Sequence, residues 1–220
     1  GMADIYGNEI TSEYSFSVDV IDRPSYARLL LPWTPLIYRA EGTQDVYFEY
    51  TNLDEGNISL YSLSFEQFAK LLRNENSALA RFNPQTDPVN TWLVDADVER
   101  NTTQYRKINL ETEDGEALAP GYYFLGVQST SLEYDYNFYQ THIFAVSTDN
   151  ITLKATDTEA FAWVTDLETG APKADVDIVF YSDKLSQLGS TRTNEDGIAY
   201  LDDLSKAPFY ARLDDDSFAG

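Results

Sequence analysis

The sequence contains no cysteine and a single histidine, His142, and these shortages exclude much metal and nucleophilic chemistry. Without cysteine, the chain has no disulfide, no thiolate ligand, no cysteine nucleophile and no thioester. A zinc site of the histidine and cysteine type is not expected either, because it needs three or four such ligands. We therefore predict no catalytic residue, no metal site and no cofactor in this chain.

Basic residues are also scarce, since 15 Lys and Arg stand against 37 Asp and Glu, for a net charge of −22. Nucleic acids and anionic membrane surfaces need a basic footprint, so neither is expected as a partner. No apolar run reaches the roughly 18 residues of a membrane-spanning helix. The start, "GMADIYGNE", lacks the basic region and apolar stretch of a signal peptide. We expect this chain to be a piece of a longer protein.

Motifs for catalysis are missing, and the chain is not expected to be an enzyme. Neither the G-x-S-x-G pattern nor a phosphate-binding loop occurs. His142 lies in an alternating segment and is predicted to be a structural or surface histidine of a strand. The acidic groups in 194–197, 202–203 and 214–216 could supply oxygen ligands to calcium. We favour a hairpin turn for "NEDG", because asparagine, aspartate and glycine tolerate positive φ.

Aromatic residues make up 14% of the chain, and most segments alternate with the period of a β-strand. In the segment 14–22, Phe16, Val18 and Val20 share one face, which predicts a half-buried strand. The segments 45–53 and 57–63 flank "DEG" and are predicted to form a hairpin. The segments 115–129 and 140–148 are expected to pair as a second hairpin.

One segment has helical spacing instead. Phe65, Phe68, Ala69 and Leu72 recur at i, i+3, i+4 and i+7, and Ser64 with Gln67 three residues later forms a capping-box sequence. This pattern predicts a single helix near 64–75.

Short strands at regular spacing then begin at Ile151, separated by the turn sequences "ETGAP", "NEDG" and "SKAP". This rhythm is typical of a β-sandwich. We predict an all-β fold of two consecutive antiparallel Ig-like sandwiches, of which the first carries the inserted helix. The first covers 1–148, with a loose segment at 1–13, and the second covers 149–220. The second is expected to be cut short at its C-terminal edge.

A loop between two predicted strands is unusually aromatic. Its aromatic residues are Tyr134, Tyr136, Phe138 and Tyr139. Exposed at a loop tip, they could stack on a sugar or anchor a neighbouring domain. Alternatively, Tyr134, Tyr136 and Phe138 continue a strand face into the core, and the sequence leaves both interpretations open.

The stretch from His142 to Leu204 resembles the junction between two macroglobulin-type domains of bacterial alpha-2-macroglobulins. The resemblance rests on a strand leading into V-T-D-L-x-T-G-x-P and on a later T-x-x-D-G turn. The matching positions are Val164, Thr165, Asp166, Leu167, Thr169, Gly170, Pro172, Thr193, Asp196 and Gly197. This sequence departs from the pattern at Lys173–Ala174–Asp175, where related modules commonly have valine, alanine and glycine.

The resemblance implies two scaffold domains of a large exported protein that traps proteases. Members of this family are cut by a protease in a bait region, rearrange and capture it, in some cases through a thioester. This chain has no cysteine for a thioester and no recognisable bait, so no functional residue carries over. The implied partners are other domains of the same parent chain and, through the parent, target proteases. The alternative is an Ig-like or transthyretin-like binding module of an adhesin or carbohydrate-binding protein, with the aromatic loop as its contact surface.

Overall fold

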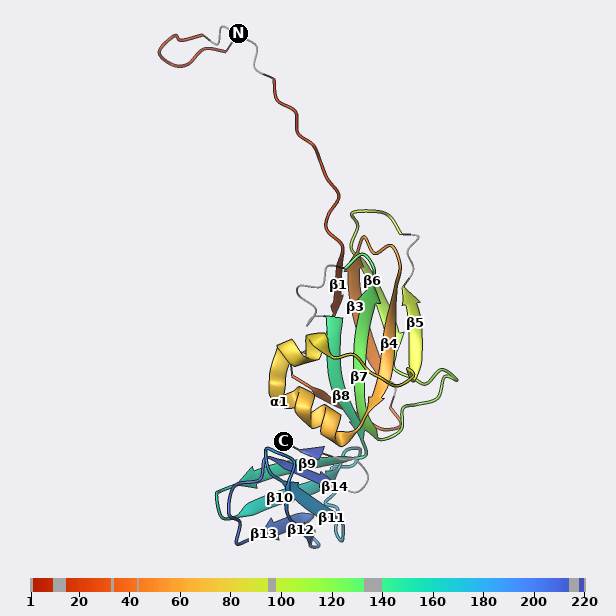
Figure 1. Cartoon of the computed structure of the whole chain (residues 1–220), viewed down its shortest axis with the longest axis vertical. Coiled ribbons are helices and arrows are strands. Elements are labelled where there is room, and N and C mark those ends of the chain that lie inside the picture. Colours follow the sequence, from red (N-terminus) through yellow and green to blue (C-terminus); the bar gives the residue numbers. More distant parts are fainter. Residues whose placement is uncertain are drawn as a thin grey trace.

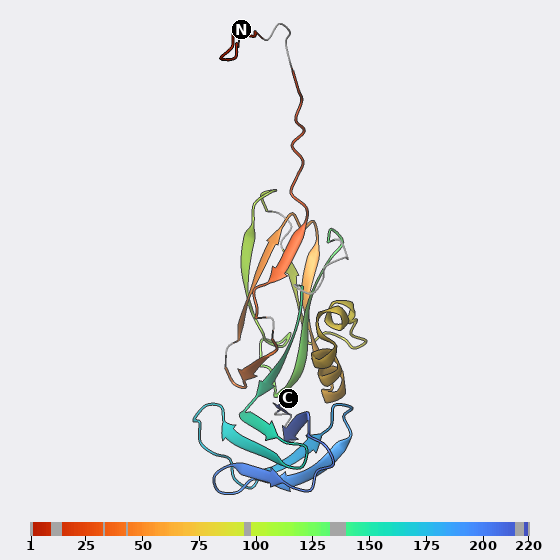
Figure 2. The same ribbon diagram turned by 90° about the vertical axis from the view of Figure 1, so that its left-hand side faces the viewer.

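The computed structural model shows an elongated molecule in which two β-sandwiches follow one another end to end (Figures 1 and 2). It describes residues 2–9, 15–32, 34–42, 44–94, 98–132, 140–213 and 218–219, with the side chains of 74–77 and 218–219 left out. An extended N-terminal segment leaves the first sandwich at the end remote from the second. The all-β fold with one inserted helix, as predicted, is confirmed over the described residues.

The first sandwich consists of a three-stranded and a five-stranded sheet. The three-stranded sheet has the order β1 (Tyr26–Leu29), β3 (Asp45–Thr51), β6 (Gln104–Asn109). The five-stranded sheet has the order β2 (Leu36–Arg39), β8 (Thr141–Ser147), β7 (Gly121–Ser129), β4 (Gly56–Leu63), β5 (Asn90–Val94). Neighbouring strands are antiparallel except β2 and β8, which run parallel.

The central strands β4, β7 and β8 of the five-stranded sheet are buried on both faces, because one face packs on the other sheet and the other packs on the helix. Leu125 and Phe144 belong to the core between the sheets, together with Phe48 of β3. Phe124 and Ile143 are one residue away and belong to a second core beneath the helix. Successive side chains of a strand point to opposite faces, so β7 and β8 read as continuous apolar runs.

The helix α1 (Phe65–Arg81) begins where the sequence predicts and runs six residues beyond the predicted end at Glu75. The Ser64 hydroxyl accepts from the Gln67 backbone N–H, and the Gln67 side chain accepts from the Ser64 N–H, as in a capping box. The extra turns are explained by packing, because Leu79 and Phe82 contact the same apolar cluster as the first turns.

The predicted hairpin of β7 and β8 is confirmed, with Gly121 opposite Val146. The predicted hairpin of β3 and β4 is wrong, because these strands lie in different sheets. Asn52 follows β3 with a φ of 51°, a left-handed conformation that ends the regular strand. The chain then crosses from one sheet to the other instead of turning back on itself.

The second sandwich pairs a three-stranded with a four-stranded sheet. The three-stranded sheet has the order β13 (Ile198–Leu201), β10 (Ala160–Asp166), β9 (Asp149–Ala155). The four-stranded sheet has the order β12 (Gln187–Arg192), β11 (Asp177–Tyr181), β14 (Tyr210–Leu213), β15 (Phe218–Ala219). Its core includes Ala162, Val164, Ile178 and Phe180, which are fully buried. Among the described strands, none of β9–β15 shares a sheet with β1–β8.

The "NEDG" segment forms a tight turn, as the sequence predicts. The Asn194 side chain accepts from the backbone N–H groups of Asp196 and Ile198, and the Gly197 N–H donates to the Asn194 carbonyl. Gly197 has a φ of 73°, which favours glycine. Among the described residues, no group of three or more His, Asp or Glu is placed to hold a metal ion. Asp214, Asp215 and Asp216 lie outside the described residues.

The strand predicted at 14–22 is not formed. Residues 15–25 belong to no helix or strand, and Val18 and Val20 are 70% and 93% exposed. Before them, Ala3 and Glu9 form an isolated bridge that closes a small turn. The alternation is present in the sequence, but a strand also needs a hydrogen-bonded neighbour, and none of the described strands pairs with this segment.

Candidate functional site at the junction of the sandwiches

The two sandwiches are joined by one residue, Thr148, which lies between β8 and β9. The Ser147 hydroxyl donates to the Asp149 carbonyl at 2.7 Å and accepts from the Asp149 N–H at 3.0 Å. The Thr148 carbonyl accepts from the Leu167 N–H at 2.9 Å. The link is therefore held by hydrogen bonds to both sides, and its backbone forms part of the folded structure.

A buried ion pair stabilises this link from the second sandwich. The Lys173 ammonium lies 2.6 Å from Oδ1 and 2.8 Å from Oδ2 of Asp149. The Asp149 side chain is 1% exposed and that of Lys173 is 33% exposed, so the carboxylate depends on this lysine for charge compensation. The preceding turn positions the lysine, because Pro172 bridges Thr165 and the Lys173 N–H donates to the Val164 carbonyl.

The departure at Lys173–Ala174–Asp175 thus has a structural explanation. Lys173 supplies the cation for Asp149. Asp175 has a φ of 59°, in the left-handed region where related modules commonly have glycine, and its N–H donates to the Thr193 carbonyl. Aspartate tolerates this conformation better than most residues.

A second contact, far from Thr148 in sequence, joins the first turn of α1 to the second sandwich. The ring of Phe65 lies 5.3 Å from that of Tyr181 and 6.0 Å from that of Tyr210 in an edge-to-face arrangement. On its own side, Phe65 also contacts Tyr122 of β7 at 5.8 Å. The Tyr210 side chain is fully buried, and its hydroxyl donates to the Ala69 carbonyl of α1 at 3.2 Å. The tyrosine of one sandwich is thus inserted against the helix of the other.

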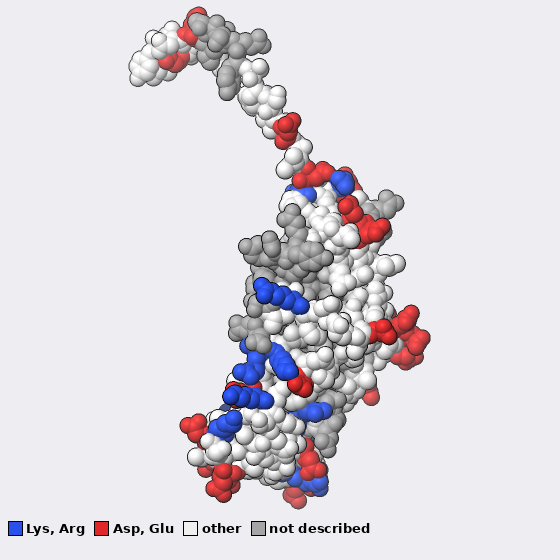
Figure 3. All heavy atoms as spheres, in the orientation of Figure 1, with Lys and Arg blue, Asp and Glu red and all other residues white. Residues whose placement is uncertain are grey.

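Charged side chains surround this aromatic contact. Figure 3 shows that Lys and Arg side chains gather over α1 and the adjoining part of the second sandwich. Asp183 lies 3.8 Å from Arg73 and 3.7 Å from Lys206, and Arg39 lies 3.2 Å from Glu168. These side chains are roughly half exposed, so each pair contributes at most about 1 kcal/mol. The aromatic contact and the Asp149–Lys173 pair therefore dominate the junction.

Tyr134, Tyr136, Phe138 and Tyr139 fall in 133–139, outside the described residues, so their role as a contact loop stays a prediction. The junction residues carried weak sequence signals. Phe65 and Tyr210 fit the apolar positions of a helix and a strand, and Lys173 stood out as a departure from the family pattern.

His142 is a core residue of the first sandwich. It is 5% exposed, shares a strand face with Phe144 and Val146, and its Nε2 meets no hydrogen-bond partner among the described residues. Burial lowers its pKa from 6.5 to about 4. A buried, neutral imidazole without a partner carboxylate does not form a catalytic arrangement with the described residues around it.

Acidification is expected to destabilise the first sandwich through His142. Between pH 6.5 and about 4 the unfolded chain takes up a proton that the folded chain does not, so stability falls as the pH falls through this window. The loss should reach about 3 kcal/mol at pH 4. Urea titrations at several pH values should show this slope in the native chain and a reduced slope in His142→Leu. Parallel curves for the two proteins would contradict the assignment.

No family model matches the sequence, and no curated protein matches it. Solved structures do match. A fragment of Escherichia coli alpha-2-macroglobulin spanning domains MG0-NIE-MG1 aligns with a TM-score of 0.65 at 13% identity, covering 95% of this chain and 67% of the fragment. A shorter fragment spanning NIE-MG1 aligns with a TM-score of 0.62 at 15% identity, covering 90% of this chain and 97% of the fragment.

A Salmonella alpha-2-macroglobulin aligns with a TM-score of 0.61 at 15% identity, covering 94% of this chain but 12% of the Salmonella chain. Among the described residues, no helix is long and apolar enough to cross a membrane. The chain therefore has the fold of consecutive β-sandwich domains of bacterial alpha-2-macroglobulins.

Proposed function

We propose that this chain is a rigid structural part of a bacterial alpha-2-macroglobulin-like protein that traps endopeptidases. In this proposal, 1–148 and 149–220 are two consecutive scaffold domains of an exported parent protein, and neither performs chemistry. The proposal rests mainly on how the two sandwiches are joined. Its most buried polar and aromatic side chains hold one sandwich against the other.

The junction favours a scaffold because it has two separate attachment points. One is the link itself, fixed by Ser147, Asp149 and Lys173. The other is the contact of Phe65 with Tyr210, made by residues distant from the link in sequence. Rotation about Thr148 alone would separate the second contact and expose its aromatic surface to water. Two attachment points therefore fix the angle between the sandwiches, whereas one would leave a hinge.

In a protease trap, such a block would keep distant parts of the parent in fixed positions before and after the bait is cut. The lack of cysteine in this chain places any thioester elsewhere in the parent. The net charge of −22 and the compact junction fit a part that supports neighbouring domains of the same chain.

The test is made on the parent protein. Purified parent, incubated with an endopeptidase, should be cut once, form a stable complex with the enzyme and protect large protein substrates from it. The 220-residue chain alone should leave the enzyme fully active, because it holds no trapping machinery. A parent that is degraded without forming a complex, or an isolated chain that inhibits by itself, would overturn the proposal.

A further inference from the structure

A groove of about 910 Å³ lies in the first sandwich, where the end of α1 meets β4, β7 and β8. This volume is within the range of about 300–1,000 Å³ that is usual for ligand sites in proteins. The groove is open to solvent and is formed on the face of the five-stranded sheet that packs on α1. The described residues of its lining that matter most here are Asn57, Tyr61, Phe82, Phe124, Gln128 and Thr141.

The groove arises because the character of this sheet face changes where the helix ends. Beneath α1, Tyr61, Phe124 and Ile143 lie side by side on β4, β7 and β8 and belong to the apolar cluster under the helix. Two residues further along β7 and β8, the same face carries Gly126 opposite Thr141. Alternate residues of a strand share a face, so large apolar side chains are followed there by small or polar ones. A hollow beside the end of the helix is the result.

Three aromatic rings form the end of the groove nearest the helix. Phe82, the first residue after α1, meets the Phe124 ring edge to face at 5.1 Å, and the Tyr61 ring lies 6.2 Å from that of Phe124. A Cβ atom at Gly126 would come within 2.8 Å of the Phe124 ring, so the glycine makes room for this ring. Tyr61 and Phe82 are partly exposed and offer apolar ring surface to a ligand.

Hydroxyl and amide groups line the rest of the groove. The Thr141 hydroxyl is buried and meets no hydrogen-bond partner among the described residues. Such a group lowers stability unless something pairs with it, so its presence needs an explanation. Asn57 and Gln128 stand opposite each other on β4 and β7, and both amides line the groove. Hydroxyl and amide groups donate as well as accept, which suits them to bind hydroxyl groups of a ligand.

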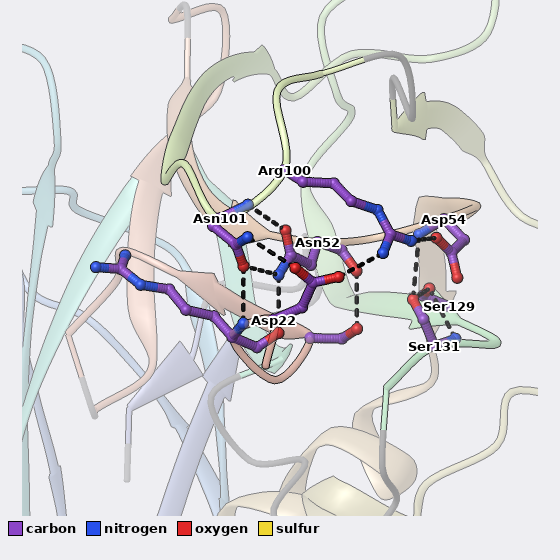
Figure 4. Close-up of polar contacts among 9 residues, drawn as sticks. Asp22, Asn52, Asp54, Arg100, Asn101, Ser129 and Ser131 are labelled. Carbon is purple, nitrogen blue, oxygen red and sulfur yellow. Dashed lines mark hydrogen bonds and ion pairs between the residues drawn. The ribbon is translucent and has the colours of Figure 1, made fainter. Parts of the chain in front are cut away.

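The end of the groove remote from the helix is fixed by a polar cluster (Figure 4). The hydroxyls of Ser129 and Ser131 share a hydrogen bond of 2.8 Å, and the Asp54 N–H donates to the Ser131 hydroxyl at 3.3 Å. The Arg100 guanidinium lies 3.5 Å from the Asp54 carboxylate. These bonds join the segment before β4 to the turn after β7. This end of the groove is therefore formed before any ligand arrives, as is usual for ligand sites.

The charges of the groove argue for a neutral ligand. Among its described lining residues, Glu55 and Arg81 are the charged ones, and they have opposite signs and exposed side chains. A phosphate or carboxylate ligand would need several cations, and a basic peptide would need several carboxylates. The groove provides neither, although the chain as a whole carries a net charge of −22.

We propose that this groove binds a neutral carbohydrate chain. A sugar ring has apolar C–H faces, which pack on aromatic rings, and hydroxyl groups at its edge, which pair with amides and hydroxyls. In the groove, Tyr61 and Phe82 supply the first kind of contact, and Asn57, Gln128 and Thr141 supply the second. The proposal does not rest on the scaffold role, because the groove lies within the first sandwich and away from the junction.

Nuclear magnetic resonance of the 220-residue chain tests the proposal. The probes are the neutral sugars cellohexaose, maltohexaose and chitohexaose, with hexagalacturonate as the anionic comparison. At least one neutral hexasaccharide should shift the amides of 57–61, 126–128 and Thr141 saturably at millimolar concentration or below, and leave that of Asp149 at the junction unchanged. A response to none of the neutral sugars, or to hexagalacturonate alone, would overturn the proposal.

A substitution at Thr141 separates ligand binding from a structural role. Thr141→Val keeps the shape and removes the buried hydroxyl, so binding should weaken about five- to tenfold. The thermal midpoint should stay the same or rise, because no unpaired polar group remains buried. Thr152→Val, on β9 of the second sandwich, is the matched control and should leave binding unchanged.

Unchanged binding in Thr141→Val, or equal weakening in the two variants, would overturn the proposal. Protease capture by the parent is measured separately. A parent that captures proteases, together with a chain that binds no neutral sugar, refutes this inference and leaves the scaffold role intact.

Discussion

Truncation of Tyr210 to alanine is expected to lower the free energy of unfolding of the second sandwich by about 3–5 kcal/mol. The Tyr210 ring is fully buried and belongs to the apolar cluster beneath α1, where it meets the edge of Phe65. Its removal leaves a cavity between the sandwiches that the rigid helix and strand cannot close. Urea denaturation followed by circular dichroism measures the change.

Tyr210→Phe is the matched control for this prediction. It keeps the ring and removes only the hydroxyl that donates to the Ala69 carbonyl, so the loss should be about 1 kcal/mol. A small and equal effect for the two substitutions would show that the ring does not fill the junction. In that case the aromatic contact could not hold the sandwiches together.

Replacement of Lys173 by methionine is expected to cost about 3–5 kcal/mol, because it leaves the Asp149 carboxylate buried without its cation. Methionine keeps most of the length and apolar contact of the lysine stem, so the loss reports mainly on charge. The thermal midpoint and the free energy of unfolding in urea should both fall.

The ion pair between Arg192 and Asp177 provides the control. The Arg192 guanidinium lies 2.7 Å from the Asp177 carboxylate, close to the 2.6 Å between Lys173 and Asp149. Both side chains of this control pair are more than half exposed. Arg192→Met should therefore cost at most about 1 kcal/mol. The double variant Asp149→Asn with Lys173→Met should recover part of the loss of Lys173→Met, since no buried charge remains. If Lys173→Met and Arg192→Met lost equal stability, the Asp149 carboxylate would have to be compensated by other groups.

Local signals in the sequence predicted much of the fold. The start of α1 was correct because a capping box is a contact between residues three apart. The turn at Asn194 was correct for the same reason, since the asparagine bonds to the backbone two and four residues on. The end of α1 was placed too early, because the final turns depend on packing against a sheet.

Contacts between distant segments could not be predicted. Alternation identified the segments of β3 and β4 as strands, yet it says nothing about which sheet a strand joins. The junction shows the same limit, because Tyr210 and Ala69 are 141 positions apart and neither carries an unusual local pattern. In the segment 15–22, the pattern of Val18 and Val20 predicted a strand, yet none of the described strands pairs with it. Local patterns therefore describe elements, and the arrangement of elements comes from packing.

The fixed angle between the sandwiches is the central claim, and electron–electron double resonance measures it most directly. The chain has no cysteine, so Glu113→Cys and Glu195→Cys give one unique spin-label site in each sandwich, both at exposed positions. We predict a single narrow distance distribution in the otherwise native chain and a broad one when Tyr210→Ala is added. A broad distribution in the otherwise native chain would mean that Thr148 acts as a hinge, and it would contradict the rigid scaffold.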